Sequence, residues 1–435
     1  MNRILFFSII LLASSLRLSA QEPDTLITEI NTQMPGASWK FSFIHLTDVH
    51  IGDGVKSDDY GTYSYYDNTD PSDAGLPLSI LRNVMHWINL HAVDEKIKFV
   101  MITGDMTESG ERSELYRFRE VMDSLLVPYI PMMGNHDTWP NALLFEAPYP
   151  TGDSLINTIF LNCFSSNASL LPAWNNGTRL THVWNPEFSC ASFFQNYRFS
   201  LGSYDFVCTD FNTREPASGV YPGAMPYANI NNYPGGSWPW LKNQLASATE
   251  TNNTFIFTHY PLSQKPSAIA SCYNATAYDS ITSYAYNYRN HLAAWLSGHL
   301  HNDSVYSVIA PGLTPSVCTQ YETAANSVNP GGHFRIVRVW DTLNVNAAPS
   351  LEVNNFNPQV FPNPANDELY ISVIPDNYSV SEFEILDITG KVIFNEKIIN
   401  SSNRPVINIS RLEKGIYILR IKLEDQIICR KFVKQ

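Results

Sequence analysis

Short apolar runs recur along the first three-quarters of the chain, and each ends in polar side chains of the kinds that bind metals. The run at residues 98–102 includes two β-branched residues and is followed by Gly104 and Asp105, which favours a buried central strand delivering a carboxylate to a loop. Because ligands at the carboxyl ends of adjacent strands meet in one crevice, the five runs of this kind predict a metal site. The polar residues that follow them are Asp48, His50, Asp105, Asn135, His136, Asp137, His259, His299 and His301.

Two segments with the spacing of amphipathic helices lie between the first three strands. Pro77 marks the beginning of the first segment and Pro128 the end of the second. The alternation of strand and helix predicts an α/β fold in which helices cover the sheets. His45 lies outside the metal pattern and is expected to be a packed strand residue. The apolar stripes are Ile80, Leu81, Val84, Met85 and Ile88, and then Leu115, Phe118, Met122, Leu125 and Leu126.

Two stretches without a clear period interrupt this alternation. Residues 58–76 begin with a polar, aromatic-rich loop that is either a substrate rim or a solvated surface insertion, and the sequence does not separate these interpretations. Residues 138–202 are longer than a plain loop and are expected to form a cap or side wall over the site. Substrate specificity is expected to lie in these two insertions.

The two ends of the chain depart from the pattern of the main domain, residues 21–340. Residues 1–20 combine a charged start, an apolar stretch too short to span a bilayer and a small-residue cleavage site, which favours a signal peptide over a membrane anchor. No further transmembrane segment is expected. Residues 341–355 lack any pattern and are predicted to be a linker. Residues 356–435 alternate like short strands between turns, which predicts a small all-β sandwich.

Composition and charge narrow the range of functions. The chain has 435 residues, a net charge of -13 and a pI near 5.3, which argues against a nucleic-acid-binding or anionic-membrane surface. Any phosphate that it binds must therefore be held by metal. The six cysteines form no CxxC pair, so zinc-finger and thioredoxin functions have no support. Export permits disulfides, with Cys163 and Cys190 as the first candidate pair, and ordinary buried thiols remain the alternative.

The polar motifs, taken in their order along the chain, resemble those of the calcineurin-like metallophosphoesterase family. The resemblance implies a sandwich of two mixed β-sheets flanked by helices, and hydrolysis of phosphate esters by water activated at two metal ions. Mixed Asp, Asn and His ligands suit Fe, Mn or Zn better than Ca²⁺ or Mg²⁺. Between about residues 41 and 305 the chain contains Asp48-x-His50, Gly104-Asp105, Gly134-Asn135-His136-Asp137, His259 and Gly298-His299-x-His301.

The resemblance also implies a role for each matching residue. His136 contacts the substrate without binding metal, and it stabilises the transition state or protonates the leaving oxygen. Asp137 beside it is suited to orienting or charging the imidazole. The implied ligands are Asp48, His50 and His301 for one metal, Asn135, His259 and His299 for the other, and Asp105 as the bridge between them.

Departures from neighbouring subfamilies limit the chemistry. Purple acid phosphatases have a tyrosinate three residues after the bridging aspartate, where this chain has Glu108, and a glycine in place of His50. An Fe(III)–tyrosinate site is therefore not expected. The chain looks closer to cyclic-nucleotide phosphodiesterases and acid-sphingomyelinase-like enzymes, and monoester, nucleotide diester and sphingomyelin-like substrates stay open. A surface binding protein with a decayed site is the alternative from another class, although the complete ligand set speaks against decay.

The tail resembles the C-terminal sorting domain of the type IX secretion system of Bacteroidetes. The resemblance covers residues 356–435 and includes the basic residues Arg430, Lys431 and Lys434. It implies recognition at the outer membrane by that secretion machinery, removal of the domain in most cases, and no part in catalysis. The protein is then expected to pass through the periplasm and to be secreted or associated with the outer surface. A carbohydrate-binding or adhesive module of similar shape is the alternative.

Overall fold

The computed structural model describes the main domain and the tail with gaps. The predictions on the signal peptide, on the loop at 58–67, on Cys163 and on most of the linker lie outside the described residues. Among the described residues, no helix is long and apolar enough to cross a membrane. The described ranges are 21–32, 35–53, 75–138, 151–160, 181–185, 190–214, 227–232, 236–247, 253–263, 271–341, 360–371, 380–387, 391–397, 406–423 and 427–435.

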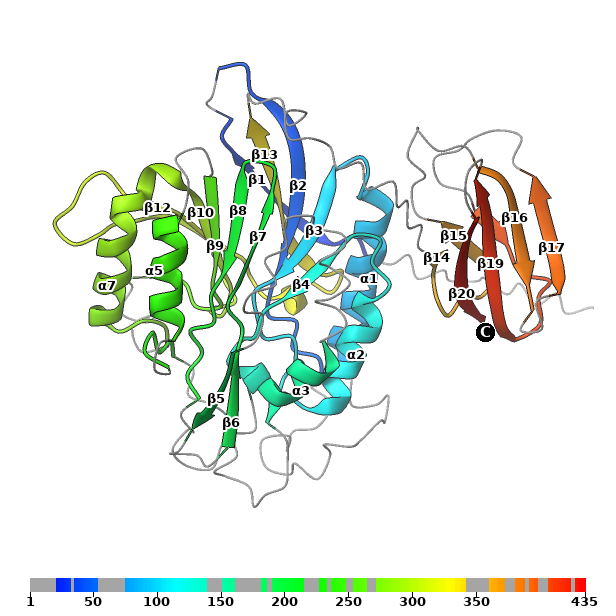
Figure 1. Cartoon of the computed structure of the whole chain (residues 1–435), viewed down its shortest axis with the longest axis horizontal. Helices are drawn as coiled ribbons and strands as arrows, with labels where there is room; N and C mark the ends of the chain where they lie inside the picture. Colours follow the sequence, from blue (N-terminus) through cyan, green and yellow to red (C-terminus); the bar gives the residue numbers. More distant parts are fainter. Residues whose placement is uncertain are drawn as a thin grey trace, which may run out of the picture.

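The first of two large sheets contains β1 (Asp24–Ile30), β2 (Ser38–Leu46), β3 (Ile97–Ile102), β4 (Tyr129–Pro131) and β13 (His333–Asp341). Its strand order is β1-β13-β2-β3-β4. The β13 strand pairs antiparallel with β2, whereas the other neighbours are parallel, so the sheet is mixed. Its outer face is covered by α1 (Gly75–His91) and α2 (Arg112–Met122) (Figure 1).

The second large sheet contains β7 (Tyr197–Leu201), β8 (Tyr204–Cys208), β9 (Asn253–Phe257), β10 (Leu292–Ser297), β11 (Ser304–Val308) and β12 (Cys318–Glu322). Its order is β11-β12-β10-β9-β8-β7, with parallel pairs at the centre and antiparallel pairs at both edges. Its outer face is covered by α5 (Ser237–Ser247) and α7 (Ala275–Ala285) (Figure 1). The main domain is therefore a four-layer arrangement of helices, sheet, sheet and helices, as the sequence analysis predicted.

An aromatic cluster holds the two sheets face to face. Phe43 of β2 stacks on Phe99 of β3 with ring centroids 5.1 Å apart, and it meets Phe206 of β8 edge-on at 5.7 Å. Phe206 in turn stacks on Phe255 of β9 at 5.3 Å. All four rings are fully buried. Because each such pair adds about 0.5–1.5 kcal/mol beyond the burial of apolar area, the cluster strongly favours this packing of the sheets.

Helices α1 and α2 bury the predicted apolar stripes, but α2 is shorter than predicted. The stripe of α1 from Ile80 to Ile88 is buried against the first sheet, as expected. A capping box between Glu111 and Glu114 begins α2, which ends at Met122 and not near Pro128. The predicted stripe is still buried as far as Leu125, because the chain after the helix keeps packing on the same core.

The second insertion contains more regular structure than the sequence analysis predicted. Its described parts are α3 (Gly152–Ile159), the hairpin of β5 (Thr181–Asn185) and β6 (Cys190–Phe194), and the edge strand β7. The second sheet therefore begins at Tyr197, inside the stretch that was expected to form a cap or side wall. Short strands of five residues carry too weak a periodic signal to be recognised among mixed Pro, Asn and aromatic residues.

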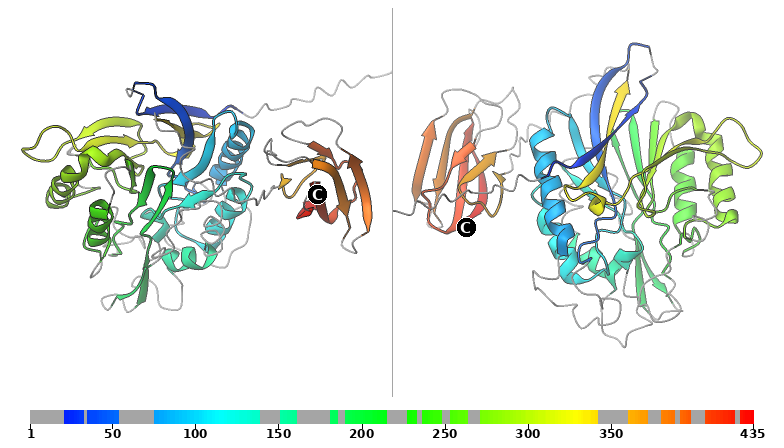
Figure 2. Two further views of the ribbon diagram at one scale, coloured as in Figure 1. Left: turned by 45° about the horizontal axis from the view of Figure 1, so that its top comes forward. Right: turned by 180° about the vertical axis from the view of Figure 1, so that it is seen from behind.

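The tail has two small sheets around a core of its own (Figure 2). One sheet has the order β14-β15-β18 and the other β17-β16-β19-β20, with antiparallel pairing throughout. This arrangement agrees with the predicted all-β sandwich. The strands are β14 (Val360–Phe361), β15 (Glu368–Ile371), β16 (Val380–Leu386), β17 (Val392–Lys397), β18 (Val406–Asn408), β19 (Gly415–Leu423) and β20 (Ile427–Lys434).

Candidate metal centre

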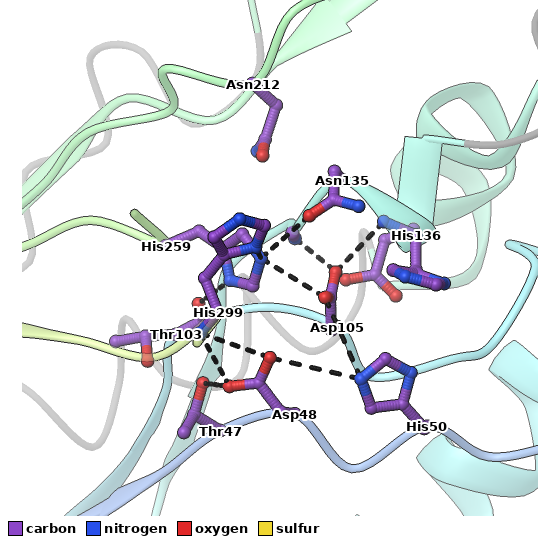
Figure 3. A network of polar contacts seen from close by, with 12 residues as sticks. Thr47, Asp48, His50, Thr103, Asp105, Asn135, His136, Asn212, His259 and His299 are labelled. Atoms are coloured by element: carbon purple, nitrogen blue, oxygen red, sulfur yellow. Dashed lines mark hydrogen bonds and ion pairs between the residues drawn. The ribbon is translucent and has the colours of Figure 1, made fainter. Parts of the chain in front are cut away.

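The residues of the predicted site all lie in segments that follow strands at one end of the sandwich. Hydrogen bonds from Asp48 N to Gly104 O (3.0 Å) and from Val49 N to Asp105 O (2.7 Å) join the loops after β2 and β3. Figure 3 shows side chains from five such segments directed toward a common centre. Asp48 and His50 follow β2, Asp105 follows β3, Asn135, His136 and Asp137 follow β4, His259 follows β9, and His299 and His301 follow β10.

Asp48, His50 and His301 form one group of possible metal ligands. His301 Nε2 lies 3.3 Å from Asp48 Oδ1 and 3.2 Å from His50 Nε2. Asp48 and His50 are buried, whereas the His301 side chain is 45% exposed. This group therefore lies where the site opens to solvent.

Asp105, His259 and His299 form a second group, and Asn135 adds an amide oxygen to it. His259 Nε2 lies 3.2 Å from His299 Nδ1 and 3.1 Å from Asn135 Oδ1. Asp105 Oδ2 is 3.2 Å from His259 Nε2 and 3.8 Å from His50 Nε2 of the first group. One carboxylate within reach of both groups is the arrangement that a bridging ligand requires.

The donor atoms of the second group fit a bound cation. His259 Nδ1 donates to Thr103 O (2.8 Å) and His299 Nε2 donates to Ser271 O (2.7 Å), since carbonyl oxygens only accept. The two nitrogens that face each other at 3.2 Å are therefore the ones with lone pairs. Two nitrogens each about 2.0–2.1 Å from one metal would be roughly 2.9–3.4 Å apart. When both rings are neutral, the facing lone pairs repel unless a proton or a metal lies between them, and their separation has the spacing for a metal.

The backbone at the site has an unusual conformation. Asp48, His50, Asp105, His299 and His301 have φ between 49° and 73°, in the left-handed region. Such a conformation costs a residue other than glycine of order 1–3 kcal/mol and persists only where the surrounding structure enforces it. Strain of this kind concentrates at functional sites, and five of the seven described residues other than glycine that have it are candidate metal ligands.

Two glycines make room for the carboxylates. A Cβ on Gly134 would lie 2.1 Å from Asp105 Oδ1, and a Cβ on Gly298 would lie 2.2 Å from Asp48 Oδ2. No side chain can be accommodated at these distances. The glycines that precede Asn135 and His299 in the sequence motifs are therefore required by the close approach of the ligand loops.

The charges within the two ligand groups favour ionised carboxylates next to the histidines. Burial raises the pKa of Asp48, but the hydrogen bond with His301 and the charge of His259 outweigh it and hold the pKa at about 2. Burial lowers the pKa of His50, whereas the hydrogen bond with Glu108 and the charge of Asp105 raise it to about 9. A proton on this histidine takes the place that a metal cation would take, so the two compete.

His136 and Asp137 follow Asn135 in a short 3₁₀ turn, η2 (His136–Thr138). His136 Nδ1 donates to Glu108 O at 2.6 Å. The Asp137 carboxylate is fully buried and accepts four hydrogen bonds, from Met106 N (3.1 Å), Thr107 N (3.0 Å), Thr107 Oγ1 (2.8 Å) and Gly134 N (2.9 Å). These hydrogen bonds hold the loops after β3 and β4 together, and a role of Asp137 in orienting or charging the imidazole stays a prediction.

The groups that fix the histidine rings were not predicted from the sequence. The Glu108 carboxylate accepts from His50 Nδ1 at 2.7 Å, and the carbonyl groups of Thr103, Glu108 and Ser271 accept from other rings of the site. Carbonyl groups carry no residue-specific signal in a sequence. Glu108, three residues after Asp105, was noted in the sequence only because it occupies the position of the tyrosine of purple acid phosphatases.

A buried ion network ties the second insertion to the neighbourhood of the site. Arg214 pairs with Asp153 of α3 at 3.2 Å and with Asp210 of the loop after β8 at 3.0 Å. Asn212 Nδ2 in the same loop donates to Met133 O at 2.7 Å, two residues before Asn135. Figure 3 places Asn212 across from Asn135 and His259. These contacts join α3 of the insertion to the loop after β8 and, through Asn212, to the loop after β4.

The fold, the candidate ligand groups and a family match together support a metal-dependent hydrolase. The family model described as calcineurin-like phosphoesterase matches residues 41–303, which is more than half of the chain. The chain therefore belongs to the calcineurin-like phosphoesterase family. Membership implies divalent metal ions, and the groups around Asp48 and Asp105 are candidates to bind them.

The tail matches a second family model, described as a secretion system C-terminal sorting domain, over residues 359–435. The order of the two matches along the chain is the one predicted. The sorting domain indicates a secreted or outer-surface protein and implies the type IX secretion machinery as a partner.

Three solved structures that are similar to this chain share little of its sequence. The anchor protein GAP50 of the inner membrane complex of Plasmodium is 13% identical, with a TM-score of 0.33 and coverage of 84% of this chain and 90% of that one. A candidate 5′-nucleotidase from Staphylococcus aureus is 12% identical, with a TM-score of 0.35 and coverage of 66% and 48%. The sulfate thiohydrolase SoxB of Thermus thermophilus is 12% identical, with a TM-score of 0.33 and coverage of 69% and 57%. No curated protein matches the chain at a significant level.

Proposed function

We propose that the protein is an exported phosphoesterase with two metal ions, which hydrolyses phosphomonoesters or phosphodiesters outside the cell. The observation that carries the proposal is the position of Asp105, whose Oδ2 lies within 4 Å of a histidine nitrogen from each ligand group. In this proposal residues 1–20 are a signal peptide, residues 21–340 the catalytic domain, residues 341–355 a linker and residues 356–435 the sorting domain.

The ligand assignment follows the two groups. Asp105 bridges the metals, and Fe, Mn or Zn are the ions that suit the mixture of carboxylate, amide and imidazole donors. His50 and His301 present Nε2 to their metal, and His299 presents Nδ1 because its Nε2 donates to Ser271 O. The proposed set is Asp48, His50 and His301 for one metal, and Asn135, His259 and His299 for the other.

The reaction combines these ligands with one acid–base group. When bound, two divalent ions would neutralise the phosphate group and lower the pKa of a water to near neutrality. His136 does not bind metal in this proposal. Its Nδ1 donates to Glu108 O, so Nε2 is the nitrogen that exchanges a proton with the leaving oxygen or stabilises the phosphoryl oxygens. Asp137 contributes indirectly, by holding Gly134 against the loop that carries Asp105.

The choice of substrate belongs to the same proposal. Phosphomonoesters, nucleotide phosphodiesters and sphingomyelin-like diesters all present the phosphate group that this site would bind. A binding protein on the same scaffold is the other possibility, and the proximity of Asp105 to a histidine of each ligand group favours the enzyme.

Metal analysis of the purified protein with a panel of phosphate esters tests the proposal. We expect about two transition-metal ions per chain, and hydrolysis of at least one substrate among nitrophenyl phosphate, bis-nitrophenyl phosphate, a cyclic nucleotide and sphingomyelin. Asp105→Asn should lower the metal content most, because a neutral amide bridges two cations poorly. Asp94→Asn makes the same change at an exposed turn and is the control. Two metals retained in Asp105→Asn would remove the bridging role, and no metal in the wild type would refute the proposal.

A further inference from the structure

We propose that Glu108 is a positioning residue that fixes the ring orientation and proton position of both His50 and His136. The inference rests on the proposed function, because it concerns how the chain presents a metal ligand and an acid–base group. One residue would then link the metal site to the group that faces the substrate.

The side chain of Glu108 acts on His50. Its Oε2 lies 2.7 Å from His50 Nδ1, and an ionised carboxylate can only accept a hydrogen bond. The proton of the neutral imidazole is therefore on Nδ1, and the lone pair is on Nε2. That nitrogen lies 3.2 Å from His301 Nε2 and 3.8 Å from Asp105 Oδ2. A carboxylate behind a metal-binding histidine fixes its tautomer and makes it a stronger ligand.

The main chain of Glu108 acts on His136. Its carbonyl oxygen accepts from His136 Nδ1 at 2.6 Å, which turns the other ring nitrogen away from the loop. The two imidazoles meet edge to face with centroids 4.7 Å apart, so rotation of either ring would displace the other. The carboxylate is also 3.8 Å from His136 Nδ1, close enough for its charge to act on both rings.

The position of Glu108 is itself fixed. Its backbone N donates to Ile51 O at 3.0 Å, next to His50, and Thr107 before it donates twice to the buried Asp137 carboxylate. The Glu108 side chain is 12% exposed. A residue held at both its main chain and its side chain can orient its neighbours, which a mobile surface glutamate could not do.

Zinc titration of variants of the full chain tests this role. With Zn²⁺ as the probe and a competing chelator, Glu108→Ala should bind one of its two ions about 10–100-fold more weakly and the other as in the wild type. Glu108→Gln keeps an acceptor oxygen for His50 Nδ1 and should lose less. Both variants keep the main-chain carbonyl that holds His136, so weaker metal binding is their main defect. Excess Zn²⁺ should therefore restore most of the turnover of Glu108→Ala. Glu120→Ala, in an exposed ion pair of α2, is the matched control.

The outcomes separate this inference from the proposed function. A wild-type chain that binds no Zn²⁺ refutes the function and the inference together. Two tightly bound ions in the wild type and unchanged affinity for both in Glu108→Ala overturn the inference alone. A third ion in the wild type that is lost in Glu108→Ala would make Glu108 a ligand and also overturn it. The metal-free variants should have the same unfolding temperature as the metal-free wild type. A much lower unfolding temperature in Glu108→Ala, together with equally weakened binding of both ions, would show a merely structural role.

Discussion

The Asp137 carboxylate provides a decisive test of how the site is built, because its hydrogen bonds indicate a structural role where the sequence indicated a catalytic one. Asp137→Asn replaces one oxygen by an amide group that donates. If Oδ2 is replaced, Met106 N and Gly134 N lose their acceptor, and if Oδ1 is replaced, the two donors of Thr107 lose theirs. Each buried donor left without a partner costs about 1–3 kcal/mol, so the expected loss is roughly 2–6 kcal/mol.

Urea unfolding of the metal-free protein, followed by tryptophan fluorescence, measures this loss in the main domain. All nine tryptophans precede residue 341, so the tail does not contribute to the signal. Asp94→Asn, at an exposed turn, should change the free energy of unfolding by less than about 0.5 kcal/mol. An Asp137→Asn variant with wild-type stability but a 100-fold or greater loss of turnover would refute the structural role and restore the orienting role beside His136.

The remaining predictions concern two histidines with different roles. His136→Ala should keep both metals and lose turnover by roughly 10²–10⁴-fold. The loss should be smaller for a nitrophenyl ester if the imidazole protonates the leaving oxygen. Loss of a metal on elemental analysis would contradict this role. His45 is fully buried between Thr103 Oγ1 and Thr323 Oγ1, and burial, followed by the charge of Arg335, lowers its pKa to about 3. Since the unfolded pKa is near 6.5, the stability that His45 contributes is present above pH 6.5 and is lost as the pH falls toward 3. Urea unfolding of the metal-free protein should therefore lose about 2–3 kcal/mol between pH 6.5 and 4.5 through this group, and His45→Gln should lose less; an equal loss in both proteins would show that His45 does not titrate in this window.

The sequence was informative wherever a residue type and a local pattern act together. The apolar runs before Asp48, Asp105 and His259 did form strands, and the stripe from Ile80 to Ile88 did form the buried face of α1. Each of these features depends on neighbours in the chain. The sequence could therefore place the candidate ligands at the ends of strands and predict that they meet.

Partners that come from other loops could not be predicted in this way. The hydrogen bond between His50 and Glu108 joins loops 58 residues apart, and its existence depends on how the ends of β2 and β3 are aligned. The carboxylate of Asp137 is adjacent to His136 in sequence, but the turn η2 directs it toward Met106 and Thr107 instead. Adjacency suggested a functional pair, but the sequence does not encode the direction of the side chain locally and therefore could not predict these four hydrogen bonds.

The left-handed backbone at five candidate ligands connects the fold to the metal. Each such residue costs of order 1–3 kcal/mol, and the ligand loops also bring ionised carboxylates within 4 Å of one another's histidines. The surrounding sandwich can hold this arrangement because the strands that precede the loops are buried in the aromatic core between the sheets. A bound cation would stabilise both features at once, since it would attract the carboxylates and bind the histidine nitrogens that face one another. Metal affinity in this protein is therefore expected to depend on the rigidity of the sheets as much as on the ligands, because a loop that relaxed its backbone would lose the convergence that the metal needs.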